Sequence, residues 1–173
     1  MTGPTAGDAE PVLATLSVAG ADVELWRATA GDLPGLVALL ADDVLGATRE
    51  TPDPSGEQLA PYRRAFDLID ADPAHLLVVA RSGGELAGTL QFSVLPGLAH
   101  RGALRGQIES VHVRQDLRGR GLGAALIGWA VAEARRRGCG LVQLTSNKAR
   151  TDAHRFYGRL GFLASHEGFK LPL

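Results

Sequence analysis

The chain has 173 residues, of which 45% are hydrophobic and 21% are charged, and its formal net charge is −1 at pH 7. This length predicts one domain with a substantial apolar core. The near-neutral charge excludes the basic face that nucleic-acid binding requires. Because Cys139 is the only cysteine, an intrachain disulfide and a CxxC metal or redox motif are excluded as well.

The chain carries no recognisable targeting or membrane signal. Its first residues lack the basic start and apolar core of a secretory signal, and no apolar run approaches the ~20 residues that span a bilayer. We therefore expect a cytoplasmic protein with no nucleic-acid or membrane partner. Residues 1–22 are expected to form an N-terminal extension, flexible over 1–9 and able to add an edge strand over 11–18. Residues 23–173 are expected to form the domain.

The first half of this domain predicts one strand and two helices. Apolar and polar residues alternate over 23–27, which is typical of a half-buried strand. Residues 29–32 can start a helix that we expect to end near Gly46. A polar loop over 47–56 then precedes a second helix over 57–70, whose apolar side chains recur on one face.

The middle of the chain predicts three strands of a central sheet. Residues 76–80 are wholly apolar, so this strand is expected to be covered on both faces. The paired glycines within 82–85 permit the positive φ of a hairpin turn, and residues 86–94 supply the partner strand. A looser crossing over 95–105 leads to the third strand, 107–113.

The last third of the chain predicts a long helix, a strand and a short helix. A glycine-rich turn over 118–124 leads into a helix that is apolar around most of its circumference. Its basic end, 135–137, is expected to be a solvated terminus rather than a binding patch. Residues 141–145 predict a strand parallel to the one before the turn. A short helix to Leu160 follows, and then one or two strands over 162–173. The order β-α-α-β-β-β-α-β-α-β describes an α/β domain whose mixed sheet has helices on both faces.

The turn Arg118-Gly119-Arg120-Gly121-Leu122-Gly123-Ala124 is a candidate anion site. The first amides of a helix lack intrahelical acceptors and carry partial positive charge from the helix dipole. Glycines let an anion approach these amides, and arginine side chains can pair with phosphate oxygens. A bound diphosphate is one interpretation of this turn, and a tight strand-to-helix connection is the other.

Two common nucleotide motifs do not fit the turn. No lysine follows the glycines as a Walker P-loop requires, and the spacing is G-x-G-x-G rather than the Rossmann G-x-G-x-x-G. The pattern that fits is R-x-x-G-x-G, formed by Arg118, Gly121 and Gly123. It is followed by Phe156-Tyr157-Gly158-Arg159-Leu160-Gly161-Phe162. This pair of motifs resembles the GCN5-related N-acetyltransferase (GNAT) superfamily, in which [QR]-x-x-G-x-[GA] lies on the diphosphate arm of acetyl-CoA.

Residues 151–157 and 165–169 also resemble the aminoalkylphosphonate acetyltransferase subgroup. The superfamily resemblance implies a GNAT-like fold, a central, mostly antiparallel sheet in which the parallel strands 107–113 and 141–145 splay apart around the pantetheine arm. The N–H of Val113 would then polarise the thioester carbonyl. The residues that would bind acetyl-CoA are Val111, Val113, Arg118, Gly119, Arg120, Gly121, Leu122, Gly123, Ala124 and Asn147.

Two side chains are implied to be catalytic. An amine with a pKa near ~10.4 is mostly protonated at neutral pH, so a base is useful. The resemblance assigns this role to Glu109, acting through water, although a solvent-facing or ion-paired carboxylate is the alternative. Tyr157 matches the family tyrosine that protonates the thiolate, and its alternative is core packing beside Phe156. Asn147, which would contact the pantetheine, is alternatively a loop residue that satisfies its own turn.

The function implied is acetyl-CoA-dependent N-acetylation of a primary amine, with a small molecule favoured, by direct attack in a ternary complex. No metal is expected, because the histidine spacings match no zinc motif. The acceptor side is expected to come from residues 45–61 and 95–105, and a homodimer is one possible assembly. The alternatives are acetylation of a protein N-terminus or lysine, and a non-catalytic domain that binds or senses acyl-CoA.

Overall fold

The computed structural model describes residues 11–42, 50 and 55–173. Within these residues a single mixed sheet has the strand order β1-β2-β3-β4-β5-β6. Its strands are β1 (Ala14–Val18), β2 (Ala21–Arg27), β3 (His75–Ser82), β4 (Glu85–Leu95), β5 (Leu104–Val113) and β6 (Cys139–Leu144). Neighbouring strands are antiparallel except for β5 and β6, which are parallel. The predicted mixed, mostly antiparallel sheet is therefore confirmed.

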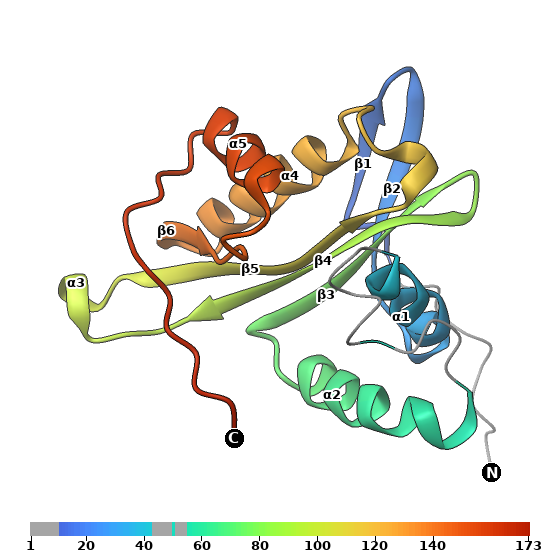
Figure 1. The fold of residues 1–173 in the computed structure, drawn as a ribbon, viewed down its shortest axis with the longest axis horizontal. Helices are drawn as coiled ribbons and strands as arrows, with labels where there is room; N and C mark the ends of the chain where they lie inside the picture. Colours follow the sequence, from blue (N-terminus) through green and yellow to red (C-terminus); the bar gives the residue numbers. More distant parts are fainter. Residues whose placement is uncertain (1–10, 43–49, 51–54) are drawn as a thin grey trace, which may run out of the picture.

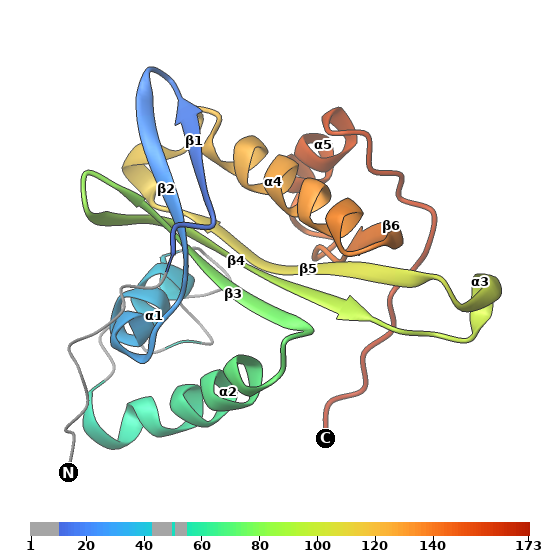
Figure 2. The ribbon, with the colours of Figure 1, turned by 180° about the vertical axis from the view of Figure 1, so that it is seen from behind.

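Helices cover both faces of this sheet (Figure 1, and from behind Figure 2). The helices α1 (Leu33–Ala41) and α2 (Ala60–Ala71) lie on one face, and α4 (Leu122–Arg136) and α5 (Thr151–Arg159) lie on the other. The shorter helices are η1 (Ala30–Asp32), η3 (Gly56–Leu59), α3 (Ala99–Gly102) and η4 (Gln115–Leu117). Each face has its own buried apolar cluster, one under α4 and one under α1 and α2. No helix in the described ranges is both long and apolar enough to cross a bilayer.

The helix α4 packs very closely against β5. A Cβ atom at Gly106 would lie 3.0 Å from the Phe92 ring and 3.1 Å from the Cβ of Ala134. Both distances are at or below ordinary contact, so this crossing requires a residue without a side chain. Leu126 and Ala130 of α4 are fully buried in the same interface. The helix α4, which the sequence predicts to be buried, therefore packs directly against β5, the strand that leads to the glycine-rich turn.

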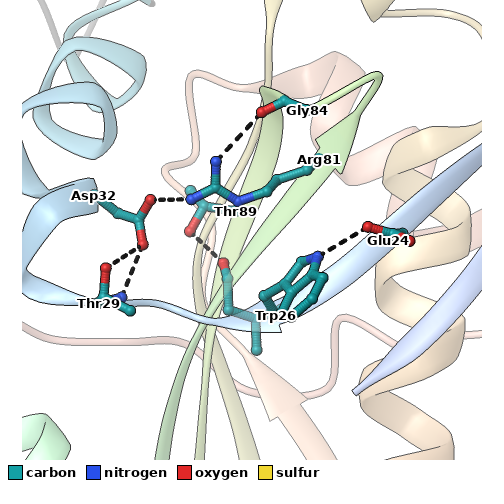
Figure 3. Close-up of polar contacts among 8 residues, drawn as sticks. Glu24, Trp26, Thr29, Asp32, Arg81, Gly84 and Thr89 are labelled. Carbon is teal, nitrogen blue, oxygen red and sulfur yellow. Dashed lines mark hydrogen bonds and ion pairs between the residues drawn. The ribbon is translucent and has the colours of Figure 1, made fainter. Parts of the chain in front are cut away.

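The start of α1 is fixed by a small polar network (Figure 3). The N–H and the hydroxyl of Thr29 donate to the carboxylate of Asp32, at 2.8 and 2.9 Å. Arg81 of β3 forms an ion pair with the same carboxylate and donates to the carbonyl of Gly84, at 3.3 Å. Nearby, the hydroxyl of Thr89 donates to a backbone carbonyl of β3 at 2.7 Å. These contacts attach α1 to the β3–β4 hairpin.

The end of α1 differs from the prediction. The helix was expected to reach Gly46, but it ends at Ala41. An aspartate is unfavourable at the negative end of the helix dipole. Here the carbonyl and the carboxylate of Asp42 instead accept hydrogen bonds from Arg118. The expectations for residues 1–9 and for most of the loop over 47–56 lie outside the described residues.

Two further expectations are corrected at the ends of the last elements. No residue of 162–173 lies in a strand, because an alternating pattern forms a strand only where a partner edge lies along its path. The basic run is also not fully solvated, since Arg137 is half-buried. Its guanidinium donates to Glu133 and to the carbonyl of Pro73, each at 2.7 Å, and lies 5.7 Å from the ring centre of Phe92.

We predict that Glu133→Gln lowers the free energy of unfolding by about 1–2 kcal/mol at neutral pH, because the three charge-assisted hydrogen bonds from Arg136 and Arg137 are weakened. Hydrogen bonding to Arg136 and then to Arg137 holds the pKa of Glu133 below its usual value, against the opposing effect of burial. A depressed folded-state pKa stabilises above the unfolded-state pKa and loses its effect as the pH falls through the folded-state value. Urea unfolding should therefore show the difference between the two proteins shrinking below about pH 5.

The matched control is Glu57→Gln. Glu57 is exposed in η3 and has no ion pair within the described residues. This variant should unfold like the wild-type protein at every pH. An equal loss in both variants, or a difference that does not depend on pH, would contradict the role assigned to Glu133.

Candidate active site

The strands β5 and β6 separate before β5 ends. Their parallel ladder stops at the pair Ile108–Leu144, whereas β5 continues to Val113. Across the β4–β5 ladder the N–H of Arg114 donates to the carbonyl of Ala87 at 2.9 Å. Because backbone groups alternate along an antiparallel strand, the N–H and C=O of Val113 point away from β4. The end of β5 therefore exposes an open backbone edge on its β6 side, and the predicted splay is confirmed.

A β-bulge lies at the point where this open edge begins. The register shifts between Thr89 and Gln91 of β4, so β5 contains one extra residue just after Glu109. That residue, Ser110, has a φ of 51°, a conformation that is uncommon outside glycine and carries strain. A bulge bends the strand and redirects its side chains. Glu109 is exposed on the face that it shares with Gln91.

The glycine-rich turn presents a row of unpaired amides. Gly119 and Gly121 have φ values of 76° and 92°, and α4 begins at the next residue. The first amide of the helix with a backbone acceptor is that of Ala125, which donates to the carbonyl of Gly121 at 3.0 Å. Within the described part of the chain, no amide of residues 119–124 donates to a backbone carbonyl. The turn therefore has the geometry of an anion site.

The two arginines of the turn are used differently. The guanidinium of Arg118 donates to the carbonyl of Val113 at 2.9 Å and to Asp42, so it joins the end of β5 to the end of α1. Arg120 is exposed and has no ion pair with another described residue. The sequence predicts that both arginines pair with phosphate. In this conformation the guanidinium of Arg118 is used within the protein, whereas that of Arg120 faces solvent.

Tyr157 lies on α5, close to the start of α4. The preceding Phe156 would be 3.4 Å from a Cβ atom at Gly123, so α5 packs on the first turn of α4. The Tyr157 ring makes edge contacts with Phe156 and Phe162, with ring centres 5.1 and 5.9 Å apart. Burial raises the pKa of the phenol above its usual value, and the charge of Arg150 opposes this only in part. The hydroxyl is therefore protonated at neutral pH.

Asn147 forms a turn of its own. Its side-chain oxygen accepts a hydrogen bond from the N–H of Ala149 at 2.9 Å, and its carbonyl accepts from Arg150 and from the His154 ring, each at 2.9 Å. Asn147 thus has the conformation of a loop asparagine that satisfies its own turn, which is the alternative to contact with the pantetheine. The side-chain NH2 group of Asn147 is not used by these bonds.

A cavity of roughly 120 Å³ lies between α1, α2 and the sheet, next to the bulge. Among the described residues its walls are apolar except at four positions, Tyr62, Thr89, Gln91 and Ser110. The other lining residues are Leu33, Leu36, Val37, Leu40, Ala65, Phe66, Ile69 and Leu77. None of the residues that line it comes from 95–105, which form the tip of the β4–β5 hairpin and α3. The expected contribution of 95–105 to an acceptor site is therefore not seen at this cavity.

The family follows from both sequence and fold. The model of the acetyltransferase (GNAT) family matches residues 37–162, which include the splayed strands, the glycine-rich turn and Tyr157. The chain belongs to the GNAT family. Members of this family are acyltransferases, and this GNAT protein is accordingly an enzyme that acts on amino groups.

Characterised relatives of this GNAT protein are N-acetyltransferases. An aminoalkylphosphonate N-acetyltransferase of Salmonella typhimurium is 35% identical over 112 residues, covering 65% of this chain and 72% of that enzyme. An L-methionine sulfoximine/L-methionine sulfone acetyltransferase of Pseudomonas paraeruginosa is 29% identical over 132 residues, covering 76% and 74%. A crystal structure described as a transcriptional regulator from Bacillus halodurans has a TM-score of 0.81 at 45% identity, and the match covers 87% of this chain and 99% of that one.

We predict that Gly121→Ala destabilises the GNAT domain by about 1–2 kcal/mol, because a Cβ atom is strained at positive φ. Gly128 provides a matched control in the same helix, where φ is negative and the space around a Cβ atom is open. Gly128→Ala should stabilise the protein by about 0.5–1 kcal/mol. Urea unfolding measures both changes. The same sign for both variants would contradict the left-handed conformation of the turn.

Proposed function

We propose that this GNAT protein transfers an acetyl group from acetyl-CoA to the primary amine of a small molecule. The observation that carries the proposal is the run of unpaired amides over 119–124, placed at the end of a strand whose outer edge is open. Helix N-terminal amides bind phosphate groups, and an open strand edge binds an extended chain that contains amides. A diphosphate joined to a pantetheine arm has both features.

The direction of the donor follows from the two ends of the open edge. Val113 lies at the glycine-rich turn, because its carbonyl accepts from Arg118, whereas Ser110 lines the cavity. A donor with its diphosphate on the turn therefore carries its acetyl group toward the cavity. We accordingly assign the polarisation of the thioester carbonyl to the N–H of Val111, which is nearer the cavity than the N–H of Val113. The backbone of Val113 would then bind the pantetheine arm.

The proposed reaction is a direct transfer. The amine nitrogen attacks the thioester carbonyl carbon, and its proton passes through water to Glu109, which is exposed beside the cavity wall. The carbon–sulfur bond breaks as the amide forms, and the departing thiolate takes a proton from the Tyr157 hydroxyl. Cys139 lies at the start of β6, at the opposite end from the splay, and burial raises the pKa of its thiol. It is therefore poorly suited to carry the acetyl group.

The cavity favours an acceptor with a small apolar substituent. Among the described residues that line it none is charged, and the carboxylate of Glu50, which accepts from the Tyr62 hydroxyl at 2.6 Å, adds no positive charge. A phosphonate or carboxylate would need a cationic or multiply hydrogen-bonded partner at that position. The relatives named above act, by their names, on an aminoalkylphosphonate and on methionine derivatives. We propose a small aliphatic amine or amino acid whose apolar side chain occupies the cavity.

An assay with purified protein tests this function. The protein is incubated with acetyl-CoA and a panel containing an aminoalkylphosphonate, methionine sulfone, branched aliphatic amines, apolar amino acids and a short peptide, and released thiol is measured. Amine-dependent release with the apolar acceptors is expected. CoA binding by calorimetry without release from any amine would instead support an acyl-CoA sensor. Absence of CoA binding would refute the proposal as a whole.

Tyr157→Phe is predicted to reduce kcat by at most about 100-fold without abolishing activity. The thiol of CoA should have a pKa near the ~8.5 of cysteine, against ~10 for tyrosine, so the leaving group needs little help from an acid. The KM for acetyl-CoA should change little, because the ring remains. Steady-state kinetics on the best acceptor measures both values. A loss greater than about 1000-fold in kcat would show that Tyr157 does more than donate a proton.

A further inference from the structure

The inner face of α5 combines Tyr157 with a charged residue. Among residues 150–159, positions 150, 153, 156 and 157 are partly buried and the others are exposed. Their spacing of i, i+3, i+6 and i+7 places them on one side of a helix. Three of them, Ala153, Phe156 and Tyr157, are apolar or aromatic, as a packed face requires. The fourth is Arg150, and an arginine is seldom found on the packed side of a helix unless a group there interacts with its charge.

The backbone holds Arg150 at the first turn of α5. Its N–H donates to the carbonyl of Asn147 at 2.9 Å, and its carbonyl accepts from the N–H of His154 at 3.1 Å. Tyr157 is seven residues further on, roughly 10 Å along the helix axis. Because helical side chains tilt toward the N-terminus, the phenol leans back over Ala153. Ala153 is small, so the long side chain of Arg150 can approach the hydroxyl across it.

This face of α5 borders the gap between β5 and β6. Val111 and Val113 of β5, Leu144 at the end of β6, and Tyr157 all pack against the same buried cluster under α4. The chain runs from the end of β6 through a short loop to Arg150. In Figure 1 α5 lies against α4 on one side of the sheet. The donor proposed above would therefore carry its thioester into a gap that has both side chains at its border.

The charge of Arg150 acts on the Tyr157 phenol. Burial raises the pKa of this phenol, and the charge of Arg150 opposes that increase. A guanidinium stays charged at any working pH. In the described part of the chain, the other charged groups on α5 and on the elements around it are engaged elsewhere or exposed: Lys148 pairs with Glu167, Arg155 with Asp152 and Arg118 with Asp42, the His154 ring bonds to the carbonyl of Asn147, and Arg120 and Arg159 are exposed.

We propose that Arg150 acts through Tyr157, a role that rests on the acetyl transfer proposed above: its guanidinium stabilises the phenolate that forms when Tyr157 protonates the departing thiolate. In that step the O–H bond of the phenol breaks and an S–H bond forms on CoA, so one negative charge moves from sulfur to the Tyr157 oxygen. Water then returns a proton to the phenolate before the next turnover. Arg150 is thus a positioning residue for the proton donor.

Without such a charge Tyr157 is a poor acid for this step. A thiol has a pKa of about 8.5 and an ordinary phenol one of about 10, so the proton leaves the weaker acid of the two. Burial makes the transfer less favourable still, because it disfavours the phenolate. A cation at the first turn of α5 opposes this effect, whereas it gains little from the neutral thioester. Arg150 should therefore affect kcat and leave the KM for acetyl-CoA unchanged.

Titration of Tyr157 tests the interaction without requiring activity. The chain has two tyrosines, so in a Tyr62→Phe background the absorbance of the phenolate reports Tyr157 alone. Arg150→Gln should raise the pH at which this phenol ionises, whereas Arg150→Lys, which keeps the charge, should stay close to the unsubstituted background. The matched control is Arg155→Gln, which removes an exposed arginine from the same helix and should leave the titration unchanged.

A second neutral variant guards against a folding defect. Circular dichroism shows whether Arg150→Gln folds, and Arg150→Met, which keeps the aliphatic length of the side chain, replaces it if it does not. A phenol that ionises at the same pH with and without the charge of Arg150, or that responds equally to Arg155→Gln, would overturn the proposal.

Steady-state kinetics tests whether the interaction serves the reaction. Arg150→Gln should lower kcat by about 10-fold, less than the loss in Tyr157→Phe, with the KM for acetyl-CoA unchanged. In the Tyr157→Phe background the same substitution should change kcat by less than about 2-fold, because no phenol remains for the charge to act on. Equal losses in the two backgrounds, or a change in KM alone, would overturn the proposal. A wild-type protein that releases no thiol would refute the proposed function and this role with it, whereas normal activity with an unchanged titration would refute the role alone.

Discussion

The constraint on which the site depends is that β5 is longer than its parallel ladder with β6. Pairing stops at Ile108, so the backbone groups of the remaining strand that face β6 have no strand partner. Backbone N–H and C=O groups require hydrogen-bond partners, which water supplies until a ligand displaces it. An extended ligand that contains amide groups can form the hydrogen bonds that this water forms in its absence. The donor binding that we propose for this protein thus follows from where one ladder ends.

Both ends of that open edge are held by contacts from outside the strand. At one end, Ser110 keeps a strained φ because the β4 ladder continues on either side of the bulge. At the other end, Arg118 donates to Val113 and to Asp42, so it links β5 and the turn to the end of α1. The close crossing of α4 at Gly106 fixes the helix whose first amides form the turn. The cavity that we propose for the acceptor and the glycine-rich turn are therefore positioned by one connected framework.

Local sequence signals predicted the conformation of the glycine-rich turn well and its surroundings less well. Gly119 and Gly121 predict the turn, because glycine is the residue that adopts a positive φ without strain. Ser110 gave no such signal, since its conformation comes from strand pairing. The hydrogen bond from Arg118 to Asp42 was also not predicted, because the two residues lie 76 positions apart in the sequence. The one or two strands expected over 162–173 do not form, because an apolar pattern alone does not show whether an edge lies in place to accept it. The roles of Glu109, Tyr157 and Asn147 stay predictions.

The same division explains why the donor is easier to infer than the acceptor. The proposed donor site consists mainly of backbone groups on β5 and the turn, which many different side chains can leave unchanged. The cavity is lined by residues of α1, α2, β3, β4 and β5, so a substitution there alters its shape or polarity. Relatives at 29–35% identity can therefore share the first site while differing in the second. The acceptor that we propose therefore follows from the described residues that line this cavity rather than from the family.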